Sequence, residues 1–303
     1  MTSELRRRAV FGFRFIDAPH VGLVVDALLE RRCADTEVAD AAPVVFTPNV
    51  DILVHLDRND SPRARSLAHR AAYVLADGQP VVWASKLLGE PLQTRLAGST
   101  LVAQLWPRIA AEGRTVLVVA PSDTVAVLVR ADHPAACVVV APMLPAHDDA
   151  ALDAFAKECV AACGEIVPEF TFVALGYPKL YVLIDELVAL WADAPQPPVH
   201  LAIGASFEMY YGLRQRSPEW VQRIGMEWFF RFLQEPRRLF RRYFVDDVAF
   251  ARIVWDARRA KARRRGTHPT MRPAQPIGRV LPGPWRRGQR PGDRDEDYAK
   301  TAN

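Results

Sequence analysis

The sequence predicts a doubly wound, Rossmann-like α/β fold with a mostly parallel sheet, followed by a helical C-terminal appendage. Short, nearly continuous apolar runs alternate with helical patterns through the first 235 residues. Strands of that kind are typical of a parallel sheet covered by helices on both faces. With 303 residues, half of them apolar, the chain is long enough to bury the core that such a sheet needs.

The elements follow one another in order from residue 44. A β-rich run at 44–46 precedes a helical pattern over 53–72, and an apolar strand at 73–76 ends at Asp77-Gly78. Beyond this turn, amphipathic periodicity predicts helices at 81–88, 101–112, 123–130, 149–163 and 180–191. Apolar runs between them predict strands at 115–119, 136–141, 170–175 and 200–203.

The composition changes after residue 212. Aromatic and apolar residues recur every four positions over 217–233, which predicts a helix. Pro236 interrupts this pattern, and two further helices are expected, over 237–245 and 246–265. The remainder is rich in Pro, Gly and Arg and is expected to be disordered. The chain is therefore divided into an α/β core (1–212), a basic and aromatic appendage (213–265) and a basic tail (266–303).

Charge is distributed unevenly along the chain. Residues 237–303 hold 18 Lys and Arg against 7 Asp and Glu, a net of +11, whereas the whole chain carries +4. The first 236 residues are therefore acidic, at −7, and the basic end is expected to meet a polyanion such as anionic lipid, diphosphate or nucleic acid. No apolar run approaches the roughly 20 residues of a transmembrane helix, and no secretory signal is recognisable, so a cytoplasmic protein is expected.

The sequence lacks the motifs of a structural metal site and of a dinucleotide-binding site. The four cysteines include one Cys-x-x-x-C pair without a neighbouring histidine pair, so we expect neither a disulfide nor a structural metal. A GxGxxG loop is absent, which argues against a dinucleotide-dependent oxidoreductase on the same fold. No cofactor is expected.

Polar or glycine-rich residues follow four of the predicted strands. The carboxyl ends of parallel strands share one edge of the sheet, where ligands bind in open α/β folds, so these loops are expected to build a pocket together. Asp-Gly is also a common turn sequence, and Asp77 taken alone fits a turn residue first. The four loops are Thr47-Pro48-Asn49, Asp77-Gly78-Gln79, Gly176-Tyr177-Pro178-Lys179 and Gly204-Ala205-Ser206.

Three long runs make the sequence similar to a known family. The first includes TPNVDILVHLDRND and AAYVLADGQPVVWASKLLGEPLQTRLAGSTLV, the second is FVALGYPK, and the third is RSPEWVQRIGMEWFFRFLQEPRRLFRRYFV. In this order they resemble the WecG/TagA/CpsF glycosyltransferases over about residues 11–245. The resemblance implies an inverting, metal-independent transfer of a sugar, usually a UDP-linked N-acetylated hexosamine, to a polyprenyl-diphosphate-linked acceptor in cell-surface polysaccharide synthesis. The enzyme would then work peripherally at the inner face of the cell membrane.

The same resemblance assigns roles to individual residues. Asp77 matches the family's proposed base, which takes the proton of the acceptor hydroxyl as its oxygen attacks the anomeric carbon. Thr47 and Asn49 match a strand-end pair that would contact the donor sugar or the acceptor. Arg95 matches an arginine near the site, with a surface ion pair as its alternative role. The expected substrate-binding residues are Thr47, Asn49, Arg95, Gly176, Lys179 and Gly204.

Arginines of the appendage are the expected cations for the leaving group. Without a metal, positive charge must stabilise the departing diphosphate, and planar guanidinium groups suit phosphate. Residues four apart share a helix face, so these arginines gather opposite an aromatic face. Such a helix fits docking on an anionic membrane and equally fits a solvated basic face. The four candidates are Arg237, Arg238, Arg241 and Arg242.

The match to the family is incomplete in four loops. Gln79 and Pro80 stand where a small apolar residue and a glycine are usual, and Leu180 stands where an amide is usual. Pro121 lies in place of paired glycines, and Glu208 in place of an aspartate. Because loss of glycine restricts how closely the backbone approaches a phosphate, the identity of the donor stays open.

Two other functions remain open at the level of sequence. A nucleic-acid-binding protein would use the basic tail, although no helix-turn-helix, zinc site or aromatic-stacking motif accompanies it. A non-catalytic scaffold of polysaccharide assembly would share the fold without the chemistry. The expected partners are a nucleotide-sugar donor, a lipid-linked acceptor and an anionic membrane surface, without nucleic acid. The donor, the acceptor, the linkage and the oligomeric state stay open, a homo-oligomer included.

Overall fold

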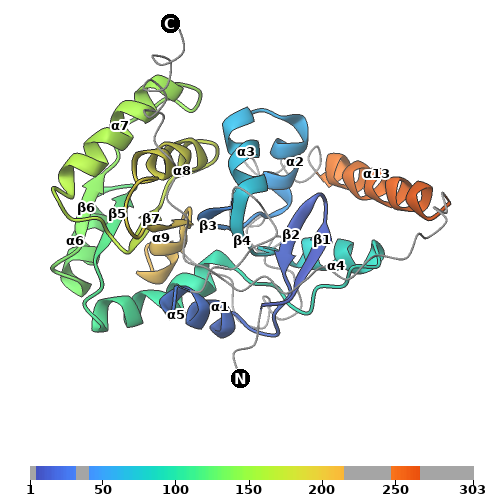
Figure 1. Ribbon diagram of the computed structural model, residues 1–303, viewed down its shortest axis with the longest axis horizontal. Helices are drawn as coiled ribbons and strands as arrows, with labels where there is room; N and C mark the ends of the chain where they lie inside the picture. Colours follow the sequence, from blue (N-terminus) through green and yellow to red (C-terminus); the bar gives the residue numbers. More distant parts are fainter. Residues whose placement is uncertain (1–4, 32–40, 215–246, 267–303) are drawn as a thin grey trace, which may run out of the picture. The chain divides into compact units, whose positions relative to one another are not determined.

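A sheet organises the residues that the computed structural model describes, which are 5–31, 41–214 and 247–266. Within these residues it has eight strands (Figure 1). In spatial order they are β1 (Arg7–Val10), β2 (Phe13–Ile16), β4 (Ala71–Val74), β3 (Ala42–Phe46), β8 (Val199–Ala202), β7 (Phe170–Val173), β5 (Val116–Ala120) and β6 (Cys137–Val140). β1 runs antiparallel to β2, and the other pairings are parallel. The predicted α/β fold class is confirmed.

Helices cover both faces of this sheet. On one face lie α2 (Val50–Arg58), α3 (Pro62–Arg70), α4 (Gln79–Leu87), α7 (Asp149–Ala162) and α8 (Lys179–Leu190). On the other face lie α1 (Gly22–Leu29), α5 (Gly98–Ala111), α6 (Asp123–Asp132) and the short α9 (Ser206–Tyr210). A last described helix, α13, spans Asp247–Gly266 and packs through Phe250 onto the first of these faces.

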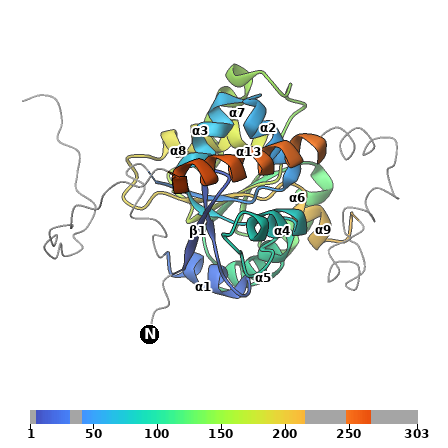
Figure 2. The same ribbon diagram turned by 90° about the vertical axis from the view of Figure 1, so that its right-hand side faces the viewer.

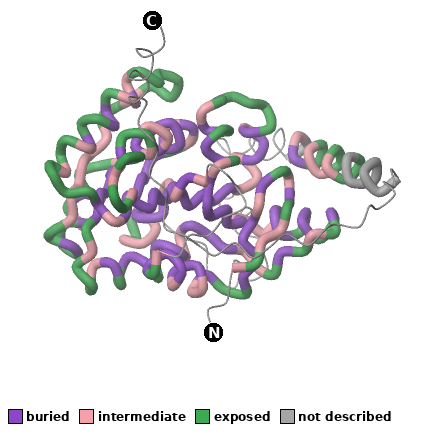
Figure 3. The backbone as a smooth tube through the Cα atoms, in the orientation of Figure 1, coloured by how far each residue is buried: buried purple, intermediate pink, exposed green. Residues whose placement is uncertain are grey.

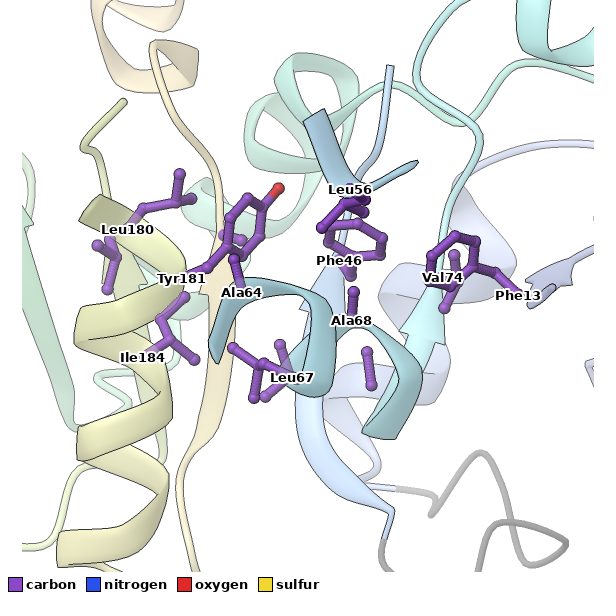
Figure 4. Close-up of a cluster of buried hydrophobic side chains, with 14 of the residues drawn as sticks. Phe13, Phe46, Leu56, Ala64, Leu67, Ala68, Val74, Leu180, Tyr181 and Ile184 are labelled. Carbon is purple, nitrogen blue, oxygen red and sulfur yellow. The ribbon is translucent and has the colours of Figure 1, made fainter. Parts of the chain in front are cut away.

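Alternate residues of each strand supply two separate cores. Val44 and Phe46 of β3 enter the core on the α3 and α8 face, whereas Val45 between them enters the core on the α5 face. Successive strand side chains point to opposite faces, which is why these strands read as continuous apolar runs. In Figure 3, which colours each residue by its burial, the buried residues concentrate along the central strands and the inner sides of the helices. Figure 4 shows the first core, where Phe46 packs against Tyr181 with ring centroids 5.2 Å apart.

The helix predicted over 53–72 is wrong, because two helices and a strand occupy that stretch. Asn59 adopts a left-handed conformation with φ of 57° and ends α2. Ser61 then caps α3 by accepting the N–H of Ala64 at 3.3 Å, with Pro62 in the first helical position. Asn is a common residue at helix ends, and Ser followed by Pro is a common start of a helix. Here these end and start signals outweigh the apolar periodicity that predicts one continuous helix.

The first strands of the chain were not expected from the sequence. β1 and β2 form a tight hairpin whose turn places Phe11 at φ 54° and Gly12 at φ 80°. Their short runs of Arg and Phe lack the aliphatic continuity of the central strands because β1 is an edge strand. Arg8 of this hairpin donates Nε–H to the buried carboxylate of Asp17 at 2.9 Å. This bond holds β1 to the residue that directly follows β2.

The predicted appendage is described only at its end. α13, labelled in Figure 2, agrees with the helix expected over 246–265. Its Phe250 ring lies 5.5 Å from that of Phe11. The helices expected over 217–233 and 237–245, and most of the predicted tail, lie outside the described residues. Among the described residues, no helix is both long and apolar enough to cross a bilayer. Cys137, Cys159 and Cys163 are free thiols.

Candidate active site

The boundary between β3 and β8 divides the sheet into two halves. β1, β2 and β4 lie on one side of it, and β7, β5 and β6 lie on the other. Thr47, directly after β3, spans the boundary by donating its buried hydroxyl to the carbonyl of Ala202 in β8 at 3.1 Å. Ligands of doubly wound folds bind outside the strand ends at such a change of strand order.

Asp77 lies on the β4 side of this boundary. Its backbone N–H donates to the carbonyl of Pro48 at 3.1 Å, which joins the loops that follow β3 and β4. Gly78 has φ of 138°, a conformation that side chains strongly disfavour, so the turn after Asp77 depends on glycine. The carboxylate Oδ2 of Asp77 accepts the N–H of Gly98 at 3.4 Å, at the first residue of α5.

Gly98 joins Asp77 to the two neighbouring strand ends. A Cβ added to Gly98 would lie 3.2 Å from Oγ1 of Thr47 and 3.6 Å from Oγ of Ser206. Ser206 is itself buried and donates its hydroxyl to the carbonyl of Ile203. The start of α5 is therefore packed directly against the loops after β3 and β8, and its N–H faces the Asp77 carboxylate.

Asp77, Gly98, Thr47 and Ser206 form what we call the Asp77 cluster. Two other predicted residues lie beside it. Asn49 caps α2, with Oδ1 accepting the N–H of Ile52 at 3.0 Å, so one of its polar atoms has a structural task. Arg95 is half-buried, and the next residue, Leu96, donates its N–H to the carbonyl of Ala76 at 2.9 Å. The segment from Arg95 to Gly98 therefore runs along the end of β4, next to Asp77.

The remaining predicted residues line a cavity at the other half of the edge. It has a volume of about 340 Å³, within the range of small-molecule sites, and is formed by residues that follow β5, β6, β7 and β8. Gly176, Lys179 and Gly204 line it, together with Glu208 and Arg214. Asp77 does not line this cavity, and the two groups meet along the chain, where Ala205 lines the cavity and the next residue, Ser206, lies beside Gly98.

The cavity lining suits a phosphorylated, hydroxyl-bearing ligand. Lys179 is the first residue of α8, a 12-residue helix, so a cation and the positive end of the helix dipole lie at one wall. The N–H groups of Leu180 and Tyr181 already donate to the carbonyls of Gly176 and Pro178. Its Nζ donates to the carbonyl of Leu144 at 3.3 Å, which holds it at the rim. Arg214 adds a second cation, and the Glu208 carboxylate supplies an acceptor for hydroxyl groups.

Tyr177 connects the cavity loop to the α2 side of the site. Its ring stacks on His55 with centroids 4.8 Å apart and meets Tyr181 edge-on at 5.8 Å. His55 in turn contacts Asp60, with 2.6 Å between Nδ1 and Oδ2. Burial, followed by the nearby carboxylates, raises the pKa of Tyr177 to about 12, so the hydroxyl stays neutral at physiological pH.

A comparison with protein families decides the classification. The model of the glycosyl transferase WecG/TagA/CpsF family matches residues 9–264. The chain belongs to this family. The resemblance inferred from the three sequence runs is confirmed, and the family places the chain among glycosyltransferases of cell-envelope polysaccharide biosynthesis.

Curated relatives within the family carry one name. The chain is 27% identical over 211 residues to an N-acetylglucosaminyldiphosphoundecaprenol N-acetyl-beta-D-mannosaminyltransferase of Bacillus spizizenii strain W23, covering 67% of this chain and 77% of the relative. It is 26% identical over 173 residues to the enzyme of the same name from Staphylococcus aureus strain MW2, covering 57% of this chain and 65% of the relative. Each name states a mannosaminyl transfer to a lipid-linked acceptor.

The departures from the family pattern have local explanations. Pro80 lies in the first turn of α4, where its missing N–H costs nothing. Leu180 is buried in the core and does not line the cavity. Pro121 and Glu208 do line the cavity, and they are the departures placed to alter what binds.

Some residues of the candidate site were not predicted from the sequence, and some predicted residues lie outside the part of the chain that the structure describes. Gly98 had a signal in the Ala97-Gly98-Ser99 start of a helix, but its contacts with Thr47 and Asp77 require the fold. Arg214 carries no motif at all. The four arginines of the appendage, Arg237, Arg238, Arg241 and Arg242, lie outside the described residues. Among the residues with described positions, no cluster of three His, Cys, Asp or Glu could hold a metal ion.

Proposed function

We propose that this chain is an inverting, metal-independent hexosaminyltransferase that moves a sugar from a nucleotide donor to a polyprenyl-diphosphate-linked acceptor. The observation that carries the proposal is the adjacency of the Asp77 cluster to the cation-lined cavity, across the β3–β8 boundary. The curated relatives support the class of acceptor and an N-acetylated hexosamine as the sugar. A UDP-linked donor is the expected form.

In this proposal the nucleotide diphosphate occupies the cavity. Lys179, Arg214 and the N-terminus of α8 supply positive charge where the diphosphate leaves, which is the task that a metal performs in other transferases. Glu208 accepts hydrogen bonds from hydroxyl groups of the nucleoside. The appendage arginines would add further cations from 237–242.

Asp77 then acts as the general base. Its carboxylate takes the proton of the acceptor hydroxyl while that oxygen forms a bond to the anomeric carbon from the face opposite the nucleotide. The bond from the anomeric carbon to the diphosphate oxygen breaks, and the nucleoside diphosphate leaves with the electron pair. The N–H of Gly98, at the positive end of α5, favours the ionised carboxylate before the reaction.

The Thr47 hydroxyl is already donated to Ala202, so its proposed role is to hold the two strand ends together and to offer lone pairs to a sugar hydroxyl. Asn49 has its Oδ1 engaged in the α2 cap, so its amide nitrogen is the group proposed to reach the substrate. Arg95 is proposed to contact the acceptor diphosphate from the segment beside Asp77.

The test is a transfer assay with the purified full chain. A panel of nucleotide sugars is incubated with a water-soluble, short-chain N-acetylglucosaminyl-diphosphate lipid, with and without EDTA. Mass spectrometry identifies the product, and NMR gives its anomeric configuration. We expect one N-acetylated hexosamine to be transferred with inversion and without loss of rate in EDTA.

Three results would contradict parts of the proposal separately. Retention of configuration would exclude the single displacement with Asp77 as base. A rate that EDTA abolishes and Mn²⁺ or Mg²⁺ restores would exclude metal independence. No transfer from any donor, with the chain folded, would favour the scaffold role.

A further inference from the structure

The outer face of α4 carries large apolar side chains in water. Trp83 is 45% exposed and Leu87, one turn later, is 68% exposed, with the exposed Lys86 beside them. The inner face of the same helix packs against the core, where Val81 and Val82 are buried. Residues four apart are neighbours on a helix surface, so the three exposed residues form one ridge. We call Trp83, Lys86 and Leu87 the α4 ridge.

The α4 ridge lies close to the proposed base. α4 begins at Gln79, two residues after Asp77, and a helix rises 1.5 Å per residue, so Trp83 is roughly 6 Å along the axis from the helix start. In the acceptor, only a sugar and a diphosphate separate the reacting hydroxyl from the lipid chain. A rigid contact between enzyme and bilayer must therefore lie within a short distance of Asp77, and α4 meets that condition.

The one charged side chain of α4 is Lys86. α4 contains no Asp or Glu. The carboxylate that follows it, Glu90, lies 3.9 Å from a guanidinium nitrogen of Arg8 in the β1–β2 hairpin. The ridge thus offers Lys86 without a competing acid on its own helix, which suits an anionic surface.

A second exposed tryptophan lies on α13, which packs against the same hairpin. α13 contacts Phe11 in the hairpin turn through Phe250, and its Trp255 is 54% exposed. The guanidinium of Arg259 lies 5.0 Å from the centre of the Trp255 ring. Arg252 is also exposed, with Asp256 as its partner at 3.6 Å. Figure 2 shows α4 and α13 together on the side of the sheet where β1 lies.

We propose that the α4 ridge inserts shallowly into the anionic membrane leaflet that carries the acceptor, and so sets the height of Asp77 above the lipid. The inference rests on the proposed function, since it concerns how that site meets a lipid-linked substrate. Tryptophan and leucine enter the boundary between headgroups and acyl chains, and Lys86 remains at the headgroups. This contact is separate from electrostatic attraction by the basic C-terminal segment.

The test separates the apolar contact from the electrostatic one by salt. Binding of the full chain to vesicles of phosphatidylcholine and phosphatidylglycerol is measured by sedimentation at about 0.1 M and 1 M salt, because the higher salt shortens electrostatic range to about 3 Å. The variant Trp83→Gln/Leu87→Gln is compared with Val127→Gln/Ile166→Gln. Val127 and Ile166 are 62% and 61% exposed and lie on the β5–β6 side of the sheet.

We expect the α4 variant to need about tenfold more lipid or more at 1 M salt, and the control variant to bind like the wild type. Trp83→Phe/Leu87→Ile should retain binding because the ridge stays apolar. Turnover of the water-soluble acceptor should be unchanged in all three variants, while turnover of a vesicle-bound acceptor falls only in Trp83→Gln/Leu87→Gln.

Unchanged salt-resistant binding in Trp83→Gln/Leu87→Gln would overturn the proposal, as would an equal loss in the control variant. A shift in sedimentation coefficient without loss of vesicle binding would show that the ridge contacts a second copy of the chain, which also overturns it. Failure of the wild type to use the soluble acceptor would instead count against the proposed function, since vesicle binding is measured without any substrate.

Discussion

The backbone N–H of Gly98 lies 3.4 Å from Oδ2 of Asp77, so the first residue of one helix faces the carboxylate proposed as the base. This contact gives Asp77 two tasks. It satisfies an N–H at the start of α5, which otherwise has no partner within the helix. It also leaves the carboxylate at the positive end of a helix, where its ionised form is favoured.

Asp77→Asn should separate these two tasks. The amide oxygen can still accept the Gly98 N–H, so folding and donor binding should be retained, but an amide cannot take the acceptor proton. We expect turnover of the soluble acceptor to fall by about 10²–10⁴-fold, which is the usual contribution of a general base. The measurement is steady-state transfer, with donor affinity from a thermal-shift titration.

The companion variant is Asp77→Ala, which removes the helix contact as well as the base. It should lose the same activity and should also lower the free energy of unfolding by about 1 kcal/mol, as is typical when the acceptor for an N–H at a helix start is lost. Wild-type turnover by Asp77→Asn would show that another group takes the proton, and Asp77 would then be a turn and cap residue only.

Gly98→Ala tests the close packing around the base. The new Cβ would lie 3.2 Å from Oγ1 of Thr47, closer than ordinary contacts, so Thr47 must move away from Ala202 or α5 must move away from Asp77. Either movement disturbs the site, and we expect turnover to fall at least tenfold with a small change in the free energy of unfolding, because alanine favours helices.

The control for Gly98→Ala is Ser99→Ala, the next residue of α5. Ser99 is half-buried, and Ser99→Ala introduces alanine into the same helix without adding a Cβ, because serine already has one. If both variants retain full turnover, the packing of α5 against Thr47 has no bearing on the reaction.

Much of the fold could be predicted because the central strands bury both faces. Val116–Ala120 is a continuous apolar run and Phe170–Val173 is apolar except for Thr171, and each strand is predicted to within two residues at either end. The β1–β2 hairpin could not be found this way. It is a sheet edge, and its role depends on contacts with segments far along the chain, such as that between Phe11 and Phe250.

The candidate site was predictable only in part for the same reason. Strand-end positions mark Asp77, Gly176 and Gly204, because the carboxyl edge of a parallel sheet gathers them. Which of them share a cavity depends on strand order, and that order places β8 between β3 and β7. Sequence periodicity carries no information about strand order, so the division into an Asp77 cluster and a separate cavity became visible only in the fold.

His200 makes the stability of the fold depend on pH. It is buried on β8, with Nδ1 2.6 Å from the hydroxyl of Thr171 on β7, and burial lowers its pKa to about 3. The unfolded chain binds this proton below about pH 6.5, and the folded chain does not until about pH 3. Stability should therefore fall as pH falls through this window, with a slope of up to about 1.4 kcal/mol per unit for one proton.

The measurement for His200 is urea unfolding at several pH values between 7 and 4. His200→Asn keeps a hydrogen-bonding partner for Thr171 but cannot titrate. The slope of the free energy of unfolding against pH should therefore be smaller in this variant than in the wild type, by up to about 1.4 kcal/mol per pH unit, which corresponds to one proton. Equal slopes would show that His200 titrates alike in the folded and unfolded chain, or that other groups dominate the window.

Arg63 joins three helices on one face of the sheet. From α3 its guanidinium donates to Asp153 of α7 at 2.7 Å and to Asp185 of α8 at 3.0 Å, and its NH2 lies 3.4 Å from Glu186. These carboxylates raise its pKa further above the usual value against the opposing effect of burial. Arg63→Gln would leave several acids close together without their shared cation. We expect a loss of about 1–3 kcal/mol in the free energy of unfolding, measured by urea denaturation.

Arg108→Gln is the matched control for this network. Arg108 of α5 pairs with Asp26 of α1 at 2.7 Å, but both side chains are 48% exposed and neither residue belongs to the Arg63 network. Exposed pairs of this kind contribute about 0–1 kcal/mol because water screens them. A loss in Arg63→Gln no larger than that in Arg108→Gln would mean that the three helices are held by their apolar contacts alone. In that case the packing of Leu67 against Ile184 and Leu187, rather than charge, would set the position of α8 and with it the Lys179 wall of the cavity.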